Sequence, residues 1–389
     1  MVNVPYPIET LGDAGQRALA SHLFCLDVDE VPEPELGAIS RQYLTDESPG
    51  KGVVLDLLGA TKRGDAWSFE RKNAAKRVSL QDARRAGRAK IAFINGREDE
   101  GHALKRYKEE LARKGVEWDE YWLDQVSLGT SGLAGFPLDR GYAWVILANP
   151  EPLEADSAPA FLLKSSIVEA IEARCPVFPA RLADATARSK LATLLALSKA
   201  GVPTPETIVT ASITDAARFV QLLHARGKDV VIKPIAKGGG WGVGKIPRGT
   251  SEGRIIDILG KYKWWYGDGV LLLQEFIENK GYDKRVLVLG DLVIGTERRF
   301  ASLGAESWIY NISRGATGAR DELDKAELHL VMAAASATGQ LFCGVDLIRG
   351  IDGRDYILEV NSTPGFKGFE HFLNINVASF VLDYLLFFR

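Results

Sequence analysis

The sequence has few cysteines, no long apolar run and no excess of charge of either sign, and each absence narrows what the protein can be. Its 389 residues include three widely spaced cysteines, Cys25, Cys175 and Cys343, which is typical of a reducing compartment and offers no zinc motif. No apolar run approaches the roughly 18 residues that cross a bilayer. Lys and Arg number 48 against 51 Asp and Glu, so the net charge of −3 gives no general attraction to nucleic acid or to an anionic membrane.

Several short motifs are missing as well. The N-terminus lacks the basic and apolar stretches of a signal peptide, so we expect a cytoplasmic protein that binds neither membrane nor nucleic acid. The apolar stretch VLDYLLFF near the C-terminus is short and contains Asp383, which favours a buried helix over an anchor. No G-x-x-x-x-G-K-[ST] loop occurs, and no G-x-G-x-x-G follows the apolar strand IAFI, which excludes the two commonest nucleotide-binding loops.

Two halves of different character make up the chain. Residues 1–88 are the least patterned part, with a helix expected within 11–26 and a strand at 53–58. From residue 90 onward, short apolar strands alternate with helices, which predicts a parallel sheet. The expected strands are 91–94, 144–148 and 176–178, and the expected helices are 101–114 and 165–174.

The second half is richer in glycine and in longer strands. One helix is expected over residues 184–200, ended by Gly201. Gly290-Asp291 and Asp352-Gly353 each separate two apolar strands, and such turns favour antiparallel hairpins. We therefore expect an α/β N-terminal domain followed by α+β domains. The divisions we predict are an N-terminal extension (1–88), an α/β domain (89–180) and the α+β part (181–389).

A basic stretch, residues 71–90, carries eight basic residues and one acid, Asp82. The plainer interpretation is the solvated face of a helix. The alternative is a patch, including Arg84, Arg85 and Arg88, that binds an anionic substrate.

A glycine-rich loop follows a strand that ends in a lysine. The strand VVIK ends at Lys233, and five of the seven residues 238–244 are glycine. Glycine lets backbone N–H groups approach phosphate oxygens closely, and a lysine can neutralise their charge. A flexible surface loop is the alternative. The phosphate-binding candidates are Lys233, Lys237, Gly238, Gly239 and Gly240.

Three oxygen ligands lie in the hairpin around Asp352-Gly353. Asp346 interrupts one apolar strand, and Glu359 and Asn361 stand two apart on the next, so these two point to one face. Buried carboxylates are costly unless they are paired or bind metal, and hard oxygen ligands suit Mg²⁺. Neutralisation by a basic residue such as Arg349 or Arg354 is the alternative.

Two further patterns are weaker. The strand end Gln274-Glu275-Phe276-Ile277 could offer backbone groups to an adenine ring, with Asp283 beyond it for ribose hydroxyls. The guanidinium groups of four arginines suit carboxylates and phosphates, although each could equally be a surface residue. They are Arg285, Arg298, Arg299 and Arg314.

Taken in this order along the chain, these motifs resemble the ATP-grasp ligases, and most closely the RimK-like branch of glutamate ligases. The resemblance is strong over residues 174–389, loose over 90–174 and absent before that; LEVNSTPGFKG is its most specific stretch. It implies two α+β subdomains that clamp ATP behind an N-terminal α/β domain.

The resemblance also assigns roles by position. Lys190 and Lys233 would reach ATP phosphates beneath the loop that contains Lys237, with Gln274 to Ile277 against adenine and Asp283 at the ribose. Asn311 and Arg314 would lie near the phosphates and the acceptor, with Arg285 and Arg298 as further catalytic arginines. Asp346, Glu359 and Asn361 would hold two Mg²⁺ ions, with Mn²⁺ as an alternative. Dimers and tetramers are common in that family, which suggests a homo-oligomer.

The acceptor region departs from the family pattern. Ile309 stands where an arginine is usual, Ala316 follows Gly315 in place of a second glycine, and Lys284 replaces the usual isoleucine between Asp283 and Arg285. The aromatic cluster Trp264-Trp265-Tyr266 is also distinctive. Core or lid packing is the main interpretation, and a surface for a flat acceptor such as a pterin is the alternative.

The function expected from the resemblance is ATP- and Mg²⁺-dependent amide ligation through an acyl phosphate. It would add L-glutamate to a small carboxylate acceptor, such as the glutamyl tail of a tetrahydromethanopterin-type cofactor. Glutamylation of a protein C-terminus and another ATP-grasp amide or peptide ligation are the alternatives. A nucleotide-binding module without turnover is a hypothesis of a different class.

Overall fold

The computed structural model of the chain describes two short N-terminal strands and most of the chain from residue 90 onward. Several sequence predictions lie outside the described residues: the elements at 11–26 and 53–58, the basic residues before Lys90, the loop residues Lys237 to Gly240, and Arg314. For residues 60–63, 66–69, 158–161 and 387 only the backbone is described. The described ranges are 60–63, 66–69, 90–96, 101–148, 158–235, 242–267, 269–301, 308–311 and 315–387.

A four-stranded parallel sheet forms the first folded unit, as the alternating pattern predicts. Its strand order is β4-β3-β7-β8, and all three strand pairs are parallel. Helix α5 ends at Gly115, whose φ of 65° suits glycine. The elements are β3 (Lys90–Asn95), α5 (His102–Lys114), β4 (Glu117–Trp122), β7 (Trp144–Ala148), α6 (Ala158–Glu172) and β8 (Val177–Phe178), with a small hairpin of β5 (Ser127–Gly129) and β6 (Gly132–Ala134).

The single helix predicted over residues 184–200 is wrong, because the chain forms two helices there. They are α7 (Arg181–Arg188) and α8 (Lys190–Lys199). Ser189 between them has an extended backbone, and its hydroxyl accepts a hydrogen bond from the Ala192 N–H at 3.2 Å. A serine that caps a new helix in this way interrupts the preceding one. The break makes Lys190 the first residue of α8.

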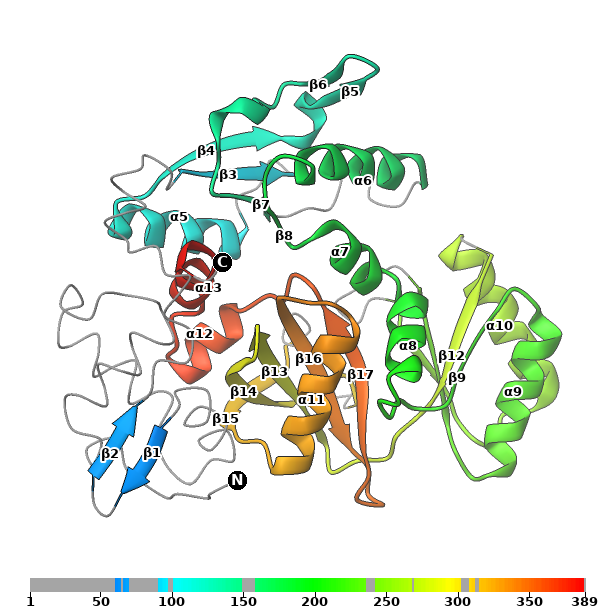
Figure 1. The fold of residues 1–389 in the computed structure, drawn as a ribbon. Helices are drawn as coiled ribbons and strands as arrows, with labels where there is room; N and C mark the ends of the chain where they lie inside the picture. The colour runs from blue at the N-terminus through cyan, green and yellow to red at the C-terminus, as the bar shows by residue number, and fades with distance from the viewer. Residues whose placement is uncertain are drawn as a thin grey trace.

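A four-stranded antiparallel sheet follows, in the order β11-β10-β12-β9. Helices α9 and α10 pack together against it (Figure 1) and bury Val230, Ile232 and Leu273 beneath them. The strands are β9 (Thr207–Thr210), β10 (Val230–Lys233), β11 (Gly244–Ile246) and β12 (Leu271–Glu275), and the helices are α9 (Ile213–Ala225) and α10 (Glu252–Tyr266).

The last sheet has five antiparallel strands in the order β15-β14-β13-β16-β17. Both predicted hairpins are confirmed, since β13 pairs with β14 and β16 pairs with β17. Helix α11 covers one face, while α12 packs against β14 and β15 (Figure 1). The elements are β13 (Tyr282–Leu289), β14 (Leu292–Phe300), β15 (Thr317–Asp321), α11 (Lys325–Ala337), β16 (Phe342–Arg349), β17 (Asp355–Asn361), α12 (Lys367–Leu373) and α13 (Val377–Phe387).

Two other features complete the description. Strands β1 (Ala60–Arg63) and β2 (Ala66–Phe69) form a separate antiparallel hairpin. Within the described part of the chain, no helix has the length and apolar content needed to cross a membrane. The structure thus agrees with the predicted fold class, while the exact domain boundaries stay a prediction.

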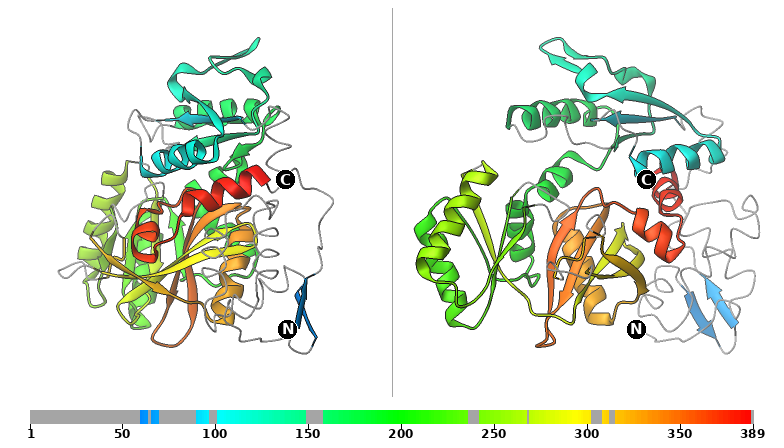
Figure 2. Two further views of the ribbon diagram at one scale, coloured as in Figure 1. Left: turned by 90° about the vertical axis from the view of Figure 1, so that its left-hand side faces the viewer. Right: turned by 180° about the vertical axis from the view of Figure 1, so that it is seen from behind.

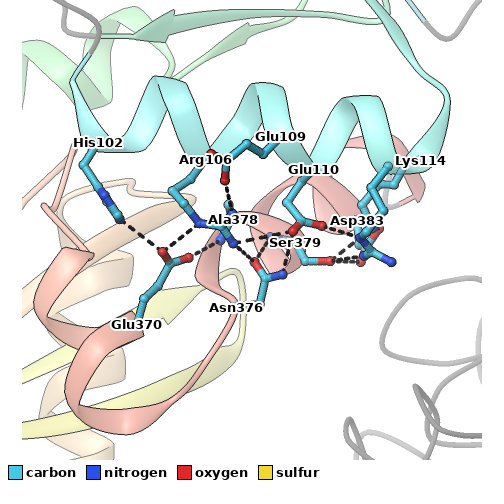
Figure 3. A network of polar contacts seen from close by, with 11 residues as sticks. His102, Arg106, Glu109, Glu110, Lys114, Glu370, Asn376, Ala378, Ser379 and Asp383 are labelled. Carbon is cyan, nitrogen blue, oxygen red and sulfur yellow. Dashed lines mark hydrogen bonds and ion pairs between the residues drawn. The ribbon is translucent and has the colours of Figure 1, made fainter.

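The C-terminal helices contact helix α5 of the first sheet, and α13 lies beside α5 (Figure 2). Glu370 of α12 accepts a hydrogen bond from Arg106 Nε at 2.9 Å and contacts His102 Nε2 at 3.1 Å (Figure 3). Farther along α5, Lys114 pairs with Asp383 of α13 at 2.6 Å. An apolar core shared by these helices lies beside the polar contacts. The predicted buried C-terminal helix is confirmed.

We predict that Glu370→Gln lowers the free energy of unfolding by about 1–3 kcal/mol, because a partly buried carboxylate that accepts charged hydrogen bonds is lost. Glu109 contacts the same Arg106 from an exposed position, so Glu109→Gln should cost less than about 0.5 kcal/mol. Urea denaturation of both variants measures the difference. Equal effects would show that the α5–α12 contact does not contribute to stability as described.

Candidate functional site

A cleft of about 140 Å³ lies between the two antiparallel sheets. Helix α8 supplies one wall, and strands β10, β12, β16 and β17 supply most of the others. Eleven of the residues named from the sequence line it, although they come from distant parts of the chain. They are Lys190, Lys233, Gln274, Glu275, Phe276, Ile277, Asp283, Arg299, Asn311, Asp346 and Glu359.

Two lysines enter the cleft from different elements. Lys190 begins α8, and its Nζ lies 3.6 Å from a carboxylate oxygen of Glu359. Lys233 ends β10, where its pKa is lowered to about 8; burial is the main cause, the charges of Glu359 and Asp346 oppose the shift, and the charge of Lys190 adds to it. Two cations at one cleft make a site of positive potential that suits an anion such as a polyphosphate.

The three predicted oxygen ligands meet on the β16–β17 hairpin. Asp346 and Glu359 are directly opposite each other across the two strands, and Asn361 follows at the end of β17. The Asn361 amide nitrogen is buried and has no acceptor among the described residues. A buried donor of this kind suits a site in which a bound anion supplies the acceptor.

Asp346 is held by two arginines. Arg285 donates to its two oxygens from Nε and Nη2, both at 2.7 Å, and Arg299 lies 3.2 Å from one of them. Burial alone would raise the pKa of Asp346, and the two guanidinium groups outweigh it and hold the pKa below its usual value. The neutralising residues are therefore not Arg349 or Arg354, which pair with Asp355 and Asp352.

This donor set fits a magnesium ion in its chemistry. Over the described ranges, no group of three or more His, Cys, Asp or Glu side chains forms a metal-binding cluster. The candidate is instead two carboxylates and one amide. Such hard oxygen donors suit Mg²⁺, which completes its shell with water and substrate phosphates.

The arginines of β14 point to opposite faces of the sheet. Arg299 lines the cleft, where its Nε donates to Asp283 at 2.8 Å. Arg298 faces the other side and forms a two-pronged pair with Asp321 at 2.9 Å. The structure therefore does not bring Arg298 into the cleft, because neighbouring residues of a strand alternate between faces.

Asp283 has a protein partner where a ribose hydroxyl was expected. Both of its oxygens accept hydrogen bonds from Arg299. Burial raises its pKa to about 6, although Arg299 opposes this shift. In this structure Asp283 orients the arginine, and contact with ribose stays a prediction.

Aromatic residues line the cleft beside Phe276, and the sequence motifs did not predict them. The Phe276 and Trp308 rings meet edge to face at 5.9 Å, and Lys245 lies over Phe276 at 4.5 Å. The Tyr310 hydroxyl donates to Asn279 at 2.8 Å. Arg299 was among the arginines named from the sequence, and the structure places it in the cleft. Trp308 and Tyr310 carried no signal in the sequence.

The aromatic cluster at the end of α10 is mostly outside the core. Trp264 is 85% exposed and Trp265 60% exposed. Tyr266 contacts Gly242, since its hydroxyl donates to the Gly242 carbonyl at 2.7 Å. The prediction of core packing is therefore wrong for Trp264. Tyr266, in contrast, packs against the core of the β11-β10-β12-β9 sheet and is hydrogen-bonded to Gly242.

A second cavity of about 290 Å³ lies where the loop after Asn361 meets the first sheet. Residues 362–367 form one side, and the start of α5 and the ends of β7 and β8 form the other. Its lining is largely apolar and aromatic, with polar groups from Ser362, Thr363, Lys367 and His102. The loop continues directly from β17, whose last residue is the candidate ligand Asn361.

Comparison with known proteins agrees with this geometry. The sequence model of the RimK-like ATP-grasp domain matches residues 187–385. The tetrahydromethanopterin:alpha-L-glutamate ligase of Methanosarcina acetivorans is 34% identical over 49% of this chain and 63% of its own length. A probable alpha-L-glutamate ligase of Legionella pneumophila is 31% identical over 52% of this chain and 65% of its own. The chain thus spans less than two thirds of these relatives.

Solved structures share the fold at lower identity. The ATP-grasp ligase PsnB, in complex with a minimal precursor, Mg and ADP, superposes with a TM-score of 0.56 at 23% identity, over 76% of this chain and 97% of PsnB. A RimK domain ATP-grasp protein from Sphaerobacter thermophilus gives a TM-score of 0.56 at 18% identity, over 77% of this chain and all of the neighbour. The family match covers just over half of the sequence, and the chain belongs to the RimK-like ATP-grasp family.

Proposed function

We propose that the chain is an ATP- and Mg²⁺-dependent ligase that joins an amino acid, L-glutamate, to a carboxylate acceptor. The observation that carries the proposal is the meeting of Lys190 and Lys233 with Asp346 and Glu359 in one cleft between two sheets, with Asn361 two residues beyond Glu359 on the same strand. Cations for phosphates beside oxygen ligands for Mg²⁺ are what phosphoryl transfer requires. The glutamate ligases among the relatives support the choice of amino acid.

In this proposal ATP lies with its base against the end of β12. The N–H groups of Glu275 and Phe276 already donate to the carbonyls of Glu206 and Asp229. Recognition of the adenine edge would therefore use the carbonyl oxygens of this segment and the Ile277 backbone. Phe276 and Trp308 give the base an apolar wall, and the phosphates extend toward Lys190 and Lys233.

Asp346, Glu359 and Asn361 would hold magnesium, which when bound neutralises charge on the phosphates. The acceptor carboxylate attacks the γ-phosphorus of ATP, ADP leaves with the electron pair of the broken bond, and an acyl phosphate results. The amine then attacks the acyl carbon, loses a proton, and phosphate leaves as the amide forms. Arg285 and Arg299 would stabilise the oxyanion of this second step, and positioning supplies the rest.

The cavity beside residues 362–367 is our candidate for the acceptor. Aromatic and apolar walls suit a flat or apolar body, and Lys367 and His102 at its rim suit a carboxylate tail. A glutamyl-tailed cofactor of the tetrahydromethanopterin type meets both requirements. A protein C-terminus is the alternative acceptor, and a non-catalytic nucleotide-binding module is the alternative class.

The ligase and binding-module proposals differ in the effect of Asp346→Asn and Glu359→Gln. As a ligase, each variant should lose at least about a hundredfold in ADP formation, because each removes charge from the site that stabilises the transferring phosphoryl group. The assay contains ATP, Mg²⁺, L-glutamate and a small-molecule extract of the source cells. Asp352→Asn, in the exposed turn of the same hairpin, is the matched control and should keep full activity.

Retained ADP formation in Asp346→Asn would contradict the assignment of the metal ligands. Nucleotide binding without any ADP formation by the wild-type protein, with either small-molecule or protein acceptors, would favour the binding module.

The lowered pKa of Lys233 leads us to predict an unusual pH dependence of nucleotide binding. Its pKa of about 8 means that the ammonium is charged below pH 8 and neutral above it, whereas an ordinary lysine stays charged to about 10.4. The Kd for ADP with Mg²⁺ should therefore rise above pH 8, by up to about tenfold per pH unit. Lys233→Arg keeps its charge and should flatten the profile. A wild-type Kd that stays constant from pH 7 to 9.5 would exclude this role.

A further inference from the structure

One buried carboxylate on the cleft face of the sheet has no part in the function described so far. Glu297 of β14 is 1% exposed, and no described residue donates a hydrogen bond to its Oε1. Burial raises its pKa to about 7 in spite of the opposing charges of Arg299 and Arg285. A buried carboxyl oxygen without a hydrogen-bond partner is costly, so its presence calls for an explanation.

Strand register places Glu297 beside an arginine that has two acidic neighbours. Arg285 of β13 lies directly opposite Glu297 on one side and directly opposite Asp346 of β16 on the other. Directly opposed residues of antiparallel strands share a face, with Cβ atoms about 4.5–5.5 Å apart. All three side chains therefore lie in one row, and in the structure Arg285 gives its two-pronged contact to Asp346.

Gly318 of β15 provides the space that Glu297 occupies. A Cβ atom at Gly318 would lie 2.1 Å from Glu297 Oε1, so the carboxyl group extends toward β15, away from the strand of Arg285. Any larger residue at position 318 would displace it. Turning the carboxyl group back toward Arg285 would require rotation of the Glu297 side chain.

The two arginines that bind Asp346 differ in their other partners. Arg299 has a second carboxylate, Asp283, to which it donates two hydrogen bonds. Arg285 has no second carboxylate of this kind among the described contacts, and its strand partner Glu297 is the acid that register brings closest. If the contact between Arg285 and Asp346 were broken, Glu297 would be the carboxylate that pairs with Arg285.

We infer that Glu297 is a positioning residue that receives Arg285 when a divalent cation binds Asp346. This rests on the proposed magnesium site, because cation binding needs the lone pairs that Asp346 now offers to Arg285. The exchange keeps the guanidinium at the edge of the cleft, paired with Glu297 and available to an anionic substrate. It also separates Arg285 from the incoming cation, which has the same sign of charge.

The test measures nucleotide binding, not turnover, so it is independent of the acceptor. A fluorescent ADP analogue is titrated with Mg²⁺ against the wild type, Glu297→Gln, Glu297→Asp and the control Glu322→Gln, an exposed acid after β15. We expect Glu297→Gln to raise the Mg²⁺ concentration at half-saturation at least fivefold and to leave ADP binding in EDTA unchanged. Glu297→Asp should recover most of the effect, and Glu322→Gln should match the wild type.

A purely structural role of Glu297 would change thermal stability or both binding measurements together, and that result would overturn the inference. So would a Glu297→Gln variant whose Mg²⁺ dependence equals that of the wild type. Nucleotide binding by the wild type with no Mg²⁺ dependence at all would instead remove the metal site of the proposed function, and the inference with it.

Discussion

The cleft depends on how the buried charge of Asp346 is balanced. A carboxylate at 5% exposure in the middle of a five-stranded sheet is stable only with close partners, and Arg285 and Arg299 are those partners. Each arginine in turn lies opposite another acid, Asp283 or Glu297. Acidic and basic side chains thus alternate on the polar face of the sheet. A ligand that changes the pairing of one of them changes the pairing of its neighbours.

The opposite face of the same sheet shows why this row can be confined to the cleft. Val286, Val345 and Leu347 are fully buried beneath α11, next to a separate ion pair between Lys284 and Glu327. Apolar and charged residues alternate along the middle of β13 and β16, so one face of the sheet is apolar there and the other carries the charged residues of the cleft. The rigid packing on one side holds the charged groups of the other in register.

The first sheet and its helix α5 form one side of the second cavity. Helix α5 is bound to α12 and α13 by Glu370, Arg106 and Asp383, and these contacts bring the ends of β7 and β8 against residues 362–367. The second cavity exists only because these parts meet. Stability of the α5 contact and the shape of the candidate acceptor site are consequently linked.

The sequence predicted best those parts of the fold in which a short local pattern allows only one structure. The turn at Asp352-Gly353 was enough to predict the hairpin that carries the candidate oxygen ligands. The helix break at Ser189 was missed because an apolar periodicity runs through both helices, and a capping hydroxyl is a weaker signal. The contacts of Arg285 and Glu297 depend on register across three strands, which no single segment contains.

Product analysis tests the central claim most directly. The protein is incubated with ATP, Mg²⁺, isotopically labelled L-glutamate and a small-molecule extract of its source cells, and the products are followed by mass spectrometry. Our account predicts a new species, heavier by one or more labelled glutamyl residues, that forms only with ATP and is absent with Asp346→Asn. ADP formation with no labelled product, from small-molecule or protein acceptors, would contradict glutamate ligation.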